Sequence, residues 1–491
     1  MISKETRVAY TATIGIECHV QFKTATKLFA AVGNDARDAE PNTLVSHICF
    51  GMPGALPVLN REAIHLGMRA AFALGTEPQK FSKFDRKHYF YPDLPTGYQI
   101  TQYDEPIILG GKVIIEVAGK KKIIHLTRAH IEADAGKSTH PAGKDYSLVD
   151  LNRAGTPLLE IVSEPEMHTA AEAKAYAQEL WLLMRYADVS DANLYYGNMR
   201  FDVNVSVSKD HQKLGTRSET KNLNSFRSVE KAVEYEINRQ IELLEKGEKV
   251  AQETRGWDDA KQKTVSQRTK EDAHDYRYFP DPDLPPVVLD DELIETVRGE
   301  MPAMPGEWRE RLSSLGLDRA AIDTLLVAEV EDEKVAYLPL VENALAERDF
   351  AKALANWLIN IEIPLRREGT AVTKTDQASR LALYHALHAL VSGGKLNSSN
   401  AKALITKILQ SDEPVKDIEA YATKHGLIQE SDEGMLEKIA DQVIAENPKA
   451  AEDVRNGEMK AIGFLVGQVM KHTQGRANPG LVRQLLKKKL S

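Results

Sequence analysis

Cysteine is scarce in this sequence: the 491 residues include only Cys18 and Cys49. A disulfide framework is therefore excluded. Long apolar runs are also missing, because the longest is far shorter than the about 20 residues that cross a bilayer. The first residues contain no uninterrupted apolar segment followed by a small-residue cleavage site, so they do not form a secretory signal. Together these absences predict a cytoplasmic protein with no membrane segment.

The common nucleotide-binding and hydrolase motifs are absent as well. The stretch GKS at 136–138 resembles the end of a P-loop, but Ile131 replaces the glycine that this motif requires five positions earlier. There is no G-x-G-x-x-G motif after a strand, no G-x-S-x-G elbow and no H-E-x-x-H pair. Cys18 precedes His19, but neighbouring strand residues point to opposite faces, so we interpret Cys18 as a core residue and not as a nucleophile.

The charge of the chain is unevenly distributed. A net charge of −9 argues against a protein whose whole surface binds nucleic acid. From Glu458 onward, however, this glutamate is the only acid among several lysines and arginines. The basic end predicts a polyanion contact confined to one module. A second interpretation stays open, because cations are also common at helix C-termini.

The chain length predicts about two to four domains. As far as about Pro286, strands, turns and a few helices indicate an α+β domain. One helix follows Thr169, and another follows Ser228 and ends at Gly247. A proline-rich stretch then gives way to helical periodicity, and the last helix opens with Asn478 as its N-cap. We therefore predict three domains, at residues 1–292, 293–410 and 411–491.

The stretch Ile14–Phe22, IGIECHVQF, alternates apolar and polar residues with the period of a half-buried strand. Glu17 and His19 therefore share the polar face. A strand that only needs a wetted side can use threonine, serine or lysine there. A carboxylate and an imidazole side by side suggest a catalytic or binding role instead.

Three other segments also place acids and bases on one strand face. The groups are Arg128, His130, Glu132 and Asp134; Arg200, Asp202, Asn204 and Ser206; and Arg217, Glu219 and Lys221. Glu160 stands inside the apolar run Leu158–Val162, where a charge needs a partner or a metal. A solvated face of an antiparallel sheet explains each strand taken alone. The recurrence of acids with bases favours one shared site.

Carboxylates that converge on one sheet face repel one another unless a cation compensates them. Mg²⁺ takes oxygen ligands and binds substrate phosphates, and arginine or lysine can hold those phosphates. The pattern therefore predicts a Mg²⁺ and nucleotide site for metal-assisted phosphoryl transfer. His19 is a less usual ligand of Mg²⁺, so two interpretations stay open: it lies outside the ligand shell, or the site accepts Mn²⁺.

These segments resemble the block motifs of the B subunits of aspartyl/glutamyl-tRNA amidotransferases, in the same order and over essentially the whole chain. The blocks are IGIECHVQF, GMPGALPVLN, FDRKHYFYPDLPTGYQITQ, RAHIEADAGKS, SLVDLNRAGTPLLEIVSEPE, TKNLNSF, DYRYFPDPDLPP and, in the tail, MKAIGFLVGQVMKHTQGRANPGLV. The resemblance implies an α+β cradle domain with a glutamine-synthetase-like antiparallel sheet. An all-α helical domain and a small all-α tail of the YqeY type, which contacts tRNA, would follow it.

The resemblance also implies an activity. The chain would use ATP to phosphorylate the side-chain carboxylate of glutamate charged onto glutamine tRNA, or of aspartate charged onto asparagine tRNA. Ammonia would then displace the phosphate. An amidase A subunit would supply this ammonia from glutamine, and a small C subunit would complete a heterotrimer. The absence of a glutaminase nucleophile agrees with that division of labour.

Position by position, the resemblance assigns the metal and catalytic residues to Glu17, His19, Glu132, Glu160 and Asp202. We also expect nucleotide or phosphate contacts from Arg128, Lys137, Arg200, Glu219 and Lys221. Two other functions stay open. One is a non-catalytic adaptor whose basic tail binds tRNA while the polar sheet face is merely solvated, and the other is a stand-alone ligase for a small amino acid.

One departure from the resemblance concerns zinc. Many members of the family carry a C-x-C and C-x-x-C set, but the equivalent positions here are Ala30, Val32, Ser46 and Cys49. Cys49 and the nearby His47 cannot complete a closed four-ligand site. We therefore predict that elemental analysis of the purified protein finds no stoichiometric zinc, and zinc at the molar amount of the chain would contradict this.

Overall fold

The computed structural model describes residues 2–210, 212–269, 275–332, 335–371, 376–411, 415, 417–428, 433–456, 458, 460–473 and 477–490. The chain divides into two compact units, Met1–Pro305 and Gly306–Ser491. Among the helices of the described residues, none is both long enough and apolar enough to span a membrane.

The first unit is built on one large sheet, in which twelve strands of the described residues take part. Along the sheet the order is β14 (Lys263–Thr269), β13 (Glu253–Asp258), β12 (Ser218–Leu223), β11 (Met199–Ser208), β1 (Thr11–Gln21), β10 (Pro157–Ser163), β7 (Lys120–Ala133), β4 (Tyr98–Thr101), β3 (Asp85–His88) and β15 (Phe279–Pro280). Two further strands, β5 (Ile108–Leu109) and β6 (Lys112–Val117), pair with β7 beside this path. The pairings are antiparallel, except that β12 and β13 run parallel.

Two small sheets complete the strands of the first unit. They pair β16 (Val287–Val288) with β2 (Phe81–Ser82) and β8 (Lys137–Thr139) with β9 (Leu148–Asp150). A short helix, α1 (Lys4–Val8), precedes β1.

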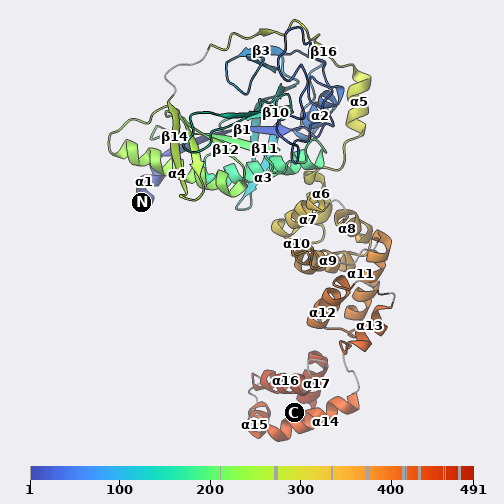
Figure 1. The fold of residues 1–491 in the computed structure, drawn as a ribbon. Helices are drawn as coiled ribbons and strands as arrows, with labels where there is room; N and C mark the ends of the chain where they lie inside the picture. The colour runs from blue at the N-terminus through green and yellow to red at the C-terminus, as the bar shows by residue number, and fades with distance from the viewer. Residues whose placement is uncertain are drawn as a thin grey trace. The chain divides into compact units, whose positions relative to one another are not determined.

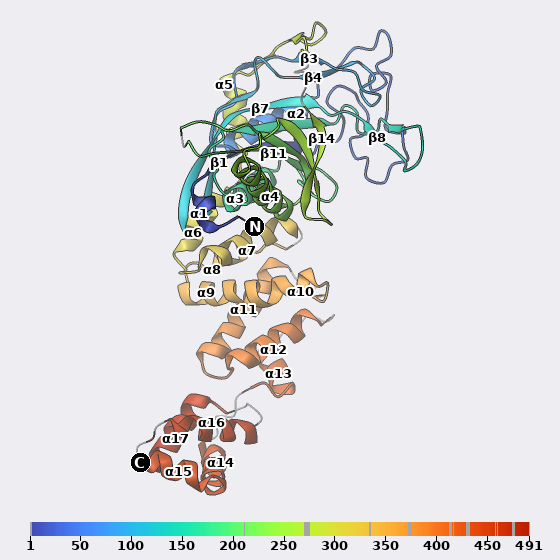
Figure 2. The ribbon, with the colours of Figure 1, turned by 90° about the vertical axis from the view of Figure 1, so that its left-hand side faces the viewer.

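Alternation along β1 separates two faces of the large sheet. Ile16, Cys18 and Val20 are buried and belong to the core of the first unit. Helices α3 (Ala170–Tyr186) and α4 (Phe226–Glu245) contribute to the same core and run beneath the central strands (Figure 1 and Figure 2). Cys18 therefore lies in the core, as predicted, and the polar side chains of β1 occupy the opposite face.

A third helix, α2 (Arg61–Ala73), covers the β7 end of the apolar face. Gly67 allows this close approach, because a Cβ atom there would lie 3.1 Å from the side chain of Ile131 and 3.2 Å from that of Ile107. Helix α5 (Asp291–Gly299) packs against α2 and adds to the same core. Residues of helices α2, α3, α4 and α5 thus share the core on the apolar face of the sheet.

Local signals fix the ends of α3 and α4. The hydroxyl of Thr169 accepts a hydrogen bond from the backbone N–H of Glu172 at 3.1 Å and caps α3, so the predicted start of this helix after Thr169 is confirmed. The predicted start of α4 is wrong by several residues. Its N-cap is Ser225, whose hydroxyl accepts a hydrogen bond from the N–H of Ser228, so Ser228 lies in the first turn. The helix ends before Gly247, as predicted.

The second unit is helical. Its first part contains α6 (Pro305–Ser313), α7 (Arg319–Glu331), α8 (Leu338–Ala344), α9 (Arg348–Trp357), the π-helical turn η1 (Leu358–Glu362), α10 (Ile363–Arg367), α11 (Gln377–Ser392), α12 (Ser398–Leu409) and α13 (Ile418–Lys424). The last four helices, α14 (Glu433–Glu446), α15 (Pro448–Arg455), α16 (Ala461–His472) and α17 (Pro479–Leu490), share a core of their own. Asn478 caps α17 as predicted, because its side-chain oxygen accepts a hydrogen bond from the N–H of Gly480 at 2.8 Å.

The mixed architecture, with a mostly antiparallel sheet followed by helices, confirms the predicted fold class. The predicted domain boundaries after residues 292 and 410 stay predictions.

A buried ionic network attaches α4 to the sheet. Glu236 of α4 is fully buried and accepts hydrogen bonds from Ser218 at 2.7 Å and Arg239 at 3.0 Å. The guanidinium of Arg255, on β13, lies 3.0 Å from the same carboxylate. Burial raises the pKa of Glu236, but hydrogen bonds and attraction from Arg239, with hydrogen bonds from Thr264 and Ser218, outweigh it and lower the pKa. The carboxylate is therefore charged at neutral pH.

We predict that Glu236→Gln lowers the free energy of unfolding by about 3 kcal/mol, because the buried Arg255 loses an anionic partner. Glu234→Gln is the matched control on the same helix, with a half-exposed side chain, and should change the free energy of unfolding by less than about 1 kcal/mol. Urea unfolding followed by circular dichroism measures both variants. Equal losses in the two variants would contradict the assignment.

Candidate functional site

The register of four central strands brings polar residues into one row across the open face. Arg200 of β11 pairs with His19 of β1. His19 also pairs with Glu160 of β10, which in turn pairs with His130 of β7. The four residues come from sequence segments that are far apart, and the sheet places them side by side.

The closest group on this face consists of His19, Glu132 and Glu160. Nε2 of His19 lies 3.4 Å from a carboxylate oxygen of Glu160 and 3.9 Å from one of Glu132. One ligand atom from each of the three residues lies within 4.8 Å of the others. His130 adjoins them, with its Nε2 3.8 Å from Glu132 and 3.7 Å from Glu160. One cation could contact all three members of the group at once.

The electrostatics show how strongly this group attracts positive charge. Burial lowers the pKa of His19, but its hydrogen bond and attraction to Glu160, and then attraction to Glu132 and Asp202, raise the pKa to about 9. Burial raises the pKa of Glu160, but His130 and His19 outweigh burial and hold that pKa well below its usual range. A protonated His19 therefore supplies compensating charge, and it would have to lose this proton in order to act as a metal ligand.

Glu17 and Asp202 pair with each other across β1 and β11, but they lie outside the close group. Asp202 accepts hydrogen bonds from Nζ of Lys221 at 3.1 Å and from the backbone N–H of Asn222 at 2.8 Å. Lys221 also lies 3.0 Å from Glu219. The predicted ligand set is therefore divided into a triad of His19 with two glutamates and a neighbouring cluster around Lys221.

Burial and nearby charges together raise the pKa values of both Glu17 and Lys221 in this second cluster. Burial, and then repulsion from Glu160 and Glu219, raise the pKa of Glu17. Burial lowers the pKa of Lys221, but attraction to Asp202 and Glu219 outweighs it and raises the pKa well above its usual range. Lys221 therefore stays charged, as a phosphate contact requires.

The other predicted phosphate contacts are placed differently. Nη2 of Arg200 lies 3.3 Å from Asp134, whose charge raises the pKa of the guanidinium. Arg128 lies over the ring of Tyr103, 5.5 Å from its centroid. Both arginines are on strands of the open face. Lys137 is exposed on β8, outside the large sheet.

Two residues near the group were not assigned a role from the sequence. His130 shares the strand face of Glu132, so alternation contained the signal for it. Lys87 of β3 adds to the attraction that lowers the pKa of Glu160, after the larger effects of His130 and His19. It lies on a four-residue strand, too short to show alternation.

The loops in which the resemblance would place zinc ligands contain a buried lysine instead. Lys27 is 1% exposed, and its Nζ donates hydrogen bonds to the carbonyl oxygen of Leu44 at 2.7 Å and to Sγ of Cys49 at 3.5 Å. The side chain of Ser46 also contacts Cys49, at 3.6 Å. A buried ammonium group thus links these loops.

The donor set of the triad fits a divalent cation. Carboxylate oxygens suit Mg²⁺, and an imidazole beside them suits Mn²⁺ as well. Within the described residues, Nδ1 of His130 and Nε of Arg128 are buried without a hydrogen-bond partner, so polar atoms remain for a ligand or its waters. The residues present therefore fit the group that the sequence predicts.

Comparison with known proteins agrees with the predicted family and fold. Residues 12–295 match the GatB/GatE catalytic domain family, and residues 339–490 match the GatB domain family. The chain is 45% identical over 493 residues to the B subunit of the aspartyl/glutamyl-tRNA(Asn/Gln) amidotransferase from Carboxydothermus hydrogenoformans, covering 98% of this chain and 99% of that one. It is 46% identical over 485 residues to the protein of the same name from Thermoanaerobacter pseudethanolicus, covering 98% of this chain and 99% of the other.

A third relative extends the comparison. The protein of the same name from Gloeothece citriformis is 44% identical over 510 residues, covering 99% of this chain and 98% of that one. The chain belongs to the family of aspartyl/glutamyl-tRNA amidotransferase B subunits.

The division of the predicted ligands leads to a test of metal affinity. We predict that His19→Ala weakens Mn²⁺ binding by at least about tenfold, because it removes a member of the triad. Asp202→Asn should weaken Mn²⁺ binding less, because the Asp202 carboxylate already accepts a hydrogen bond from Lys221. Mn²⁺ titration followed by electron paramagnetic resonance measures the affinities. Gln21→Ala, a substitution on the same face of β1, is the control. Equal losses in the Asp202 and His19 variants would contradict the division.

Proposed function

We propose that this chain is the amide-forming subunit of a tRNA-dependent amidotransferase. Its substrate would be glutamate charged onto glutamine tRNA, aspartate charged onto asparagine tRNA, or both. The observation that carries the proposal is the triad of His19, Glu132 and Glu160 on an open sheet face. Arg200 and Lys221 lie on the adjoining strands β11 and β12. The relatives named above are all B subunits of such enzymes.

The chemistry requires activation of a carboxylate. A carboxylate is a poor electrophile, whereas its acyl phosphate carries a good leaving group. In the proposed reaction the side-chain carboxylate attacks the γ-phosphorus of ATP, and ADP leaves. Ammonia then attacks the acyl carbon, and phosphate leaves with the electrons of the broken carbon–oxygen bond. The products are an amide on the tRNA, ADP and phosphate.

The chain's own residues have defined tasks in this scheme. His19, Glu132 and Glu160 would hold Mg²⁺, with Glu17 and Asp202 beside them. When bound, Mg²⁺ supplies positive charge that stabilises the transferring phosphoryl group. Lys221 of β12 and Arg200 of β11 would orient the phosphate oxygens from the strands beside β1. Glu132 and Asp202 are 4% and 5% exposed, so little water screens their charges.

The proposal includes partner subunits. The described residues contain no cysteine on the polar face of β1, since Cys18 is buried in the core, so glutamine hydrolysis is assigned to a separate amidase subunit. A small third subunit and charged tRNA complete the proposed assembly. The helical core of α14–α17, which ends in three consecutive lysines, is the proposed tRNA-contacting module. We also propose the three-domain division given by the sequence.

A non-catalytic tRNA adaptor is the second candidate, and Glu132→Ala separates the two. We predict that Glu132→Ala lowers ATP-dependent amide formation by the assembled enzyme by at least about 100-fold, because the phosphoryl group loses electrostatic stabilisation. Affinity for tRNA should stay unchanged. The measurements are amide formation on charged tRNA and a filter-binding assay. Glu105→Ala, at an exposed position, is the control.

Unchanged amidation by Glu132→Ala, with normal tRNA binding, would contradict the catalytic proposal and support the adaptor. The same assay without charged tRNA tests the third candidate, a ligase for a free amino acid. ATP hydrolysis that needs no tRNA would support that ligase.

A further inference from the structure

Arg128 differs from Lys221 and Arg200 in having no anionic partner. Lys221 lies 3.1 Å from Asp202, and Arg200 lies 3.3 Å from Asp134. The side chain of Arg128 forms no ion pair within the part of the chain that the structure describes, and its buried Nε has no hydrogen-bond partner there. A half-buried guanidinium without a counter-charge is suited to an anionic ligand, because its N–H donors remain unused.

An aromatic pair holds this guanidinium in place. The guanidinium lies 5.5 Å from the ring centroid of Tyr103, and Tyr103 stacks on Tyr278 at a centroid distance of 3.8 Å and an angle of 9°. The backbone N–H of Tyr103 donates a hydrogen bond to the buried carboxylate of Asp85 at 3.3 Å, which fixes the segment after β4. A cation–π contact positions an arginine without neutralising its charge.

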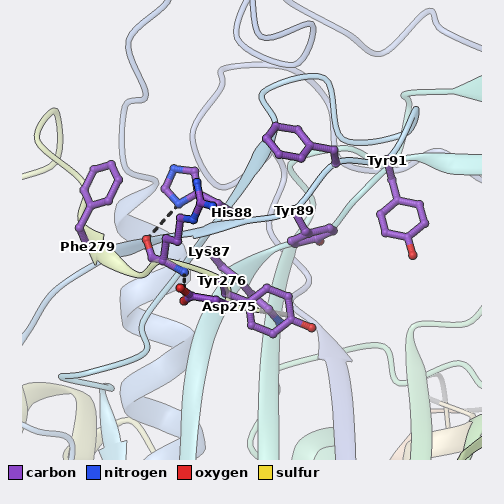
Figure 3. Close-up of a pocket in the computed structure, with 9 residues that line it drawn as sticks. Lys87, His88, Tyr89, Tyr91, Asp275, Tyr276 and Phe279 are labelled. Carbon is purple, nitrogen blue, oxygen red and sulfur yellow. Dashed lines mark hydrogen bonds between the residues drawn. The ribbon is translucent and has the colours of Figure 1, made fainter. Parts of the chain in front are cut away.

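Tyr278 connects this aromatic pair to the acidic triad. Burial, then the two neighbouring tyrosines, and then the charges of Glu132 and Glu160 raise the pKa of Tyr278 above its usual range. One of these tyrosines, Tyr276, meets Tyr278 by its edge at a centroid distance of 6.0 Å. Tyr276 also lines a pocket of about 760 Å³ at the sheet edge where β3 pairs with β15 (Figure 3). The ring of Tyr278 is therefore close to both glutamates of the triad.

The strand register separates Arg128 from Lys221. In the row next to the triad, Asp202 of β11 pairs with Glu17 of β1. Glu17 also pairs with Val162 of β10, which pairs with Arg128 of β7. The Cα atoms of Asp202 and Arg128 are therefore three strand spacings, or about 14 Å, apart. Lys221 lies at the β11 end of this row beside Asp202, and Arg128 lies at the β7 end.

The proposed phosphoryl transfer needs binding groups on both sides of the transferring phosphorus. The attacking and leaving oxygens lie roughly in line in such a transfer. With the triphosphate held by Lys221 and Arg200 on the β11 side, the attacking carboxylate approaches from the β7 side. Arg128 lies on that side and retains its N–H donors. A planar guanidinium matches a carboxylate with two parallel hydrogen bonds.

We propose that Arg128 binds the side-chain carboxylate of the aminoacyl group on the tRNA and so distinguishes the acidic substrate from its neutral amide product. This inference rests on the proposed function, in which that carboxylate belongs to glutamate or aspartate. The amide carries no charge and has an NH₂ donor in place of one oxygen, so a guanidinium binds it more weakly. The sequence predicts a phosphate contact for Arg128 instead, and direct binding measurements separate the two roles.

Binding of charged tRNA to the enzyme assembled with its partner subunits tests the proposal without turnover. The probes are two pairs of tRNAs, glutamyl- and glutaminyl-tRNA(Gln), and aspartyl- and asparaginyl-tRNA(Asn). Each is titrated with Mg²⁺ and a non-hydrolysable ATP analogue present, and affinity for the analogue is measured separately. Arg128→Met removes the charge and keeps an apolar stem. Arg227→Met, at an exposed arginine of α4, is the matched control.

We predict that the wild type binds the acidic member of at least one pair about tenfold more tightly than its amide, and that Arg128→Met reduces this preference to less than about twofold. Affinity for the ATP analogue should stay within about twofold of wild type, and Arg227→Met should leave the preference unchanged. If Arg128→Met does not fold, Tyr103→Leu replaces it, because it removes the ring that positions the guanidinium. Tyr103→Phe should then keep the preference.

A preference in Arg128→Met equal to that of the wild type would overturn the proposal, as would equal affinities of the wild type for both members of each pair. A loss of about tenfold or more in affinity for the ATP analogue would assign Arg128 to a phosphate and would also overturn it. Failure of the proposed function would look different. The wild-type enzyme would then form no amide, and the binding measurements would still decide whether Arg128 recognises the carboxylate.

Discussion

Carboxylates crowded on one face of a sheet repel one another, and the whole site depends on how this repulsion is compensated. Glu132 and Glu160 lie against the imidazoles of His19 and His130, and Asp202 lies against Lys221. Burial strengthens both repulsion and attraction, because little water screens the charges. The face therefore needs positive charge from protons, lysines or a metal. That requirement also makes it suitable for a cation-bound triphosphate.

The apolar face of the same sheet fixes the geometry. Cys18 lies between Glu17 and His19 in sequence and is packed in the core, so a slip of one residue in β1 would exchange the polar and apolar sets. Such a slip would bury two ionisable groups and expose the core, which the packing of α3 and α4 opposes. Paired strands thus hold the triad in place.

Alternation predicted which residues share a face, and a lone charge in an apolar run correctly marked Glu160 as a residue with partners. Alternation alone could not predict which acids converge, because convergence depends on the strand order and on the register between segments that are distant in sequence. His19 thus meets Glu160 and Glu132, whereas Asp202 meets Lys221. The sequence also placed the start of α4 after Ser228, whereas its N-cap is Ser225. The pocket lined by Tyr89, Tyr276 and Phe279 was not predicted from the sequence. Its residues lie on short edge strands and loops, which are too short to show a hydrophobic periodicity.

The central claim is that the open face forms an acyl phosphate on the substrate side chain, and an oxygen-isotope tracer tests this most directly. The assembled enzyme would be given ATP, glutamine and charged tRNA whose side-chain carboxylate carries ¹⁸O, and the released phosphate would be analysed by mass spectrometry. The account predicts that one carboxylate oxygen is transferred to each phosphate released with an amide. Amide formation with phosphate free of ¹⁸O would contradict it.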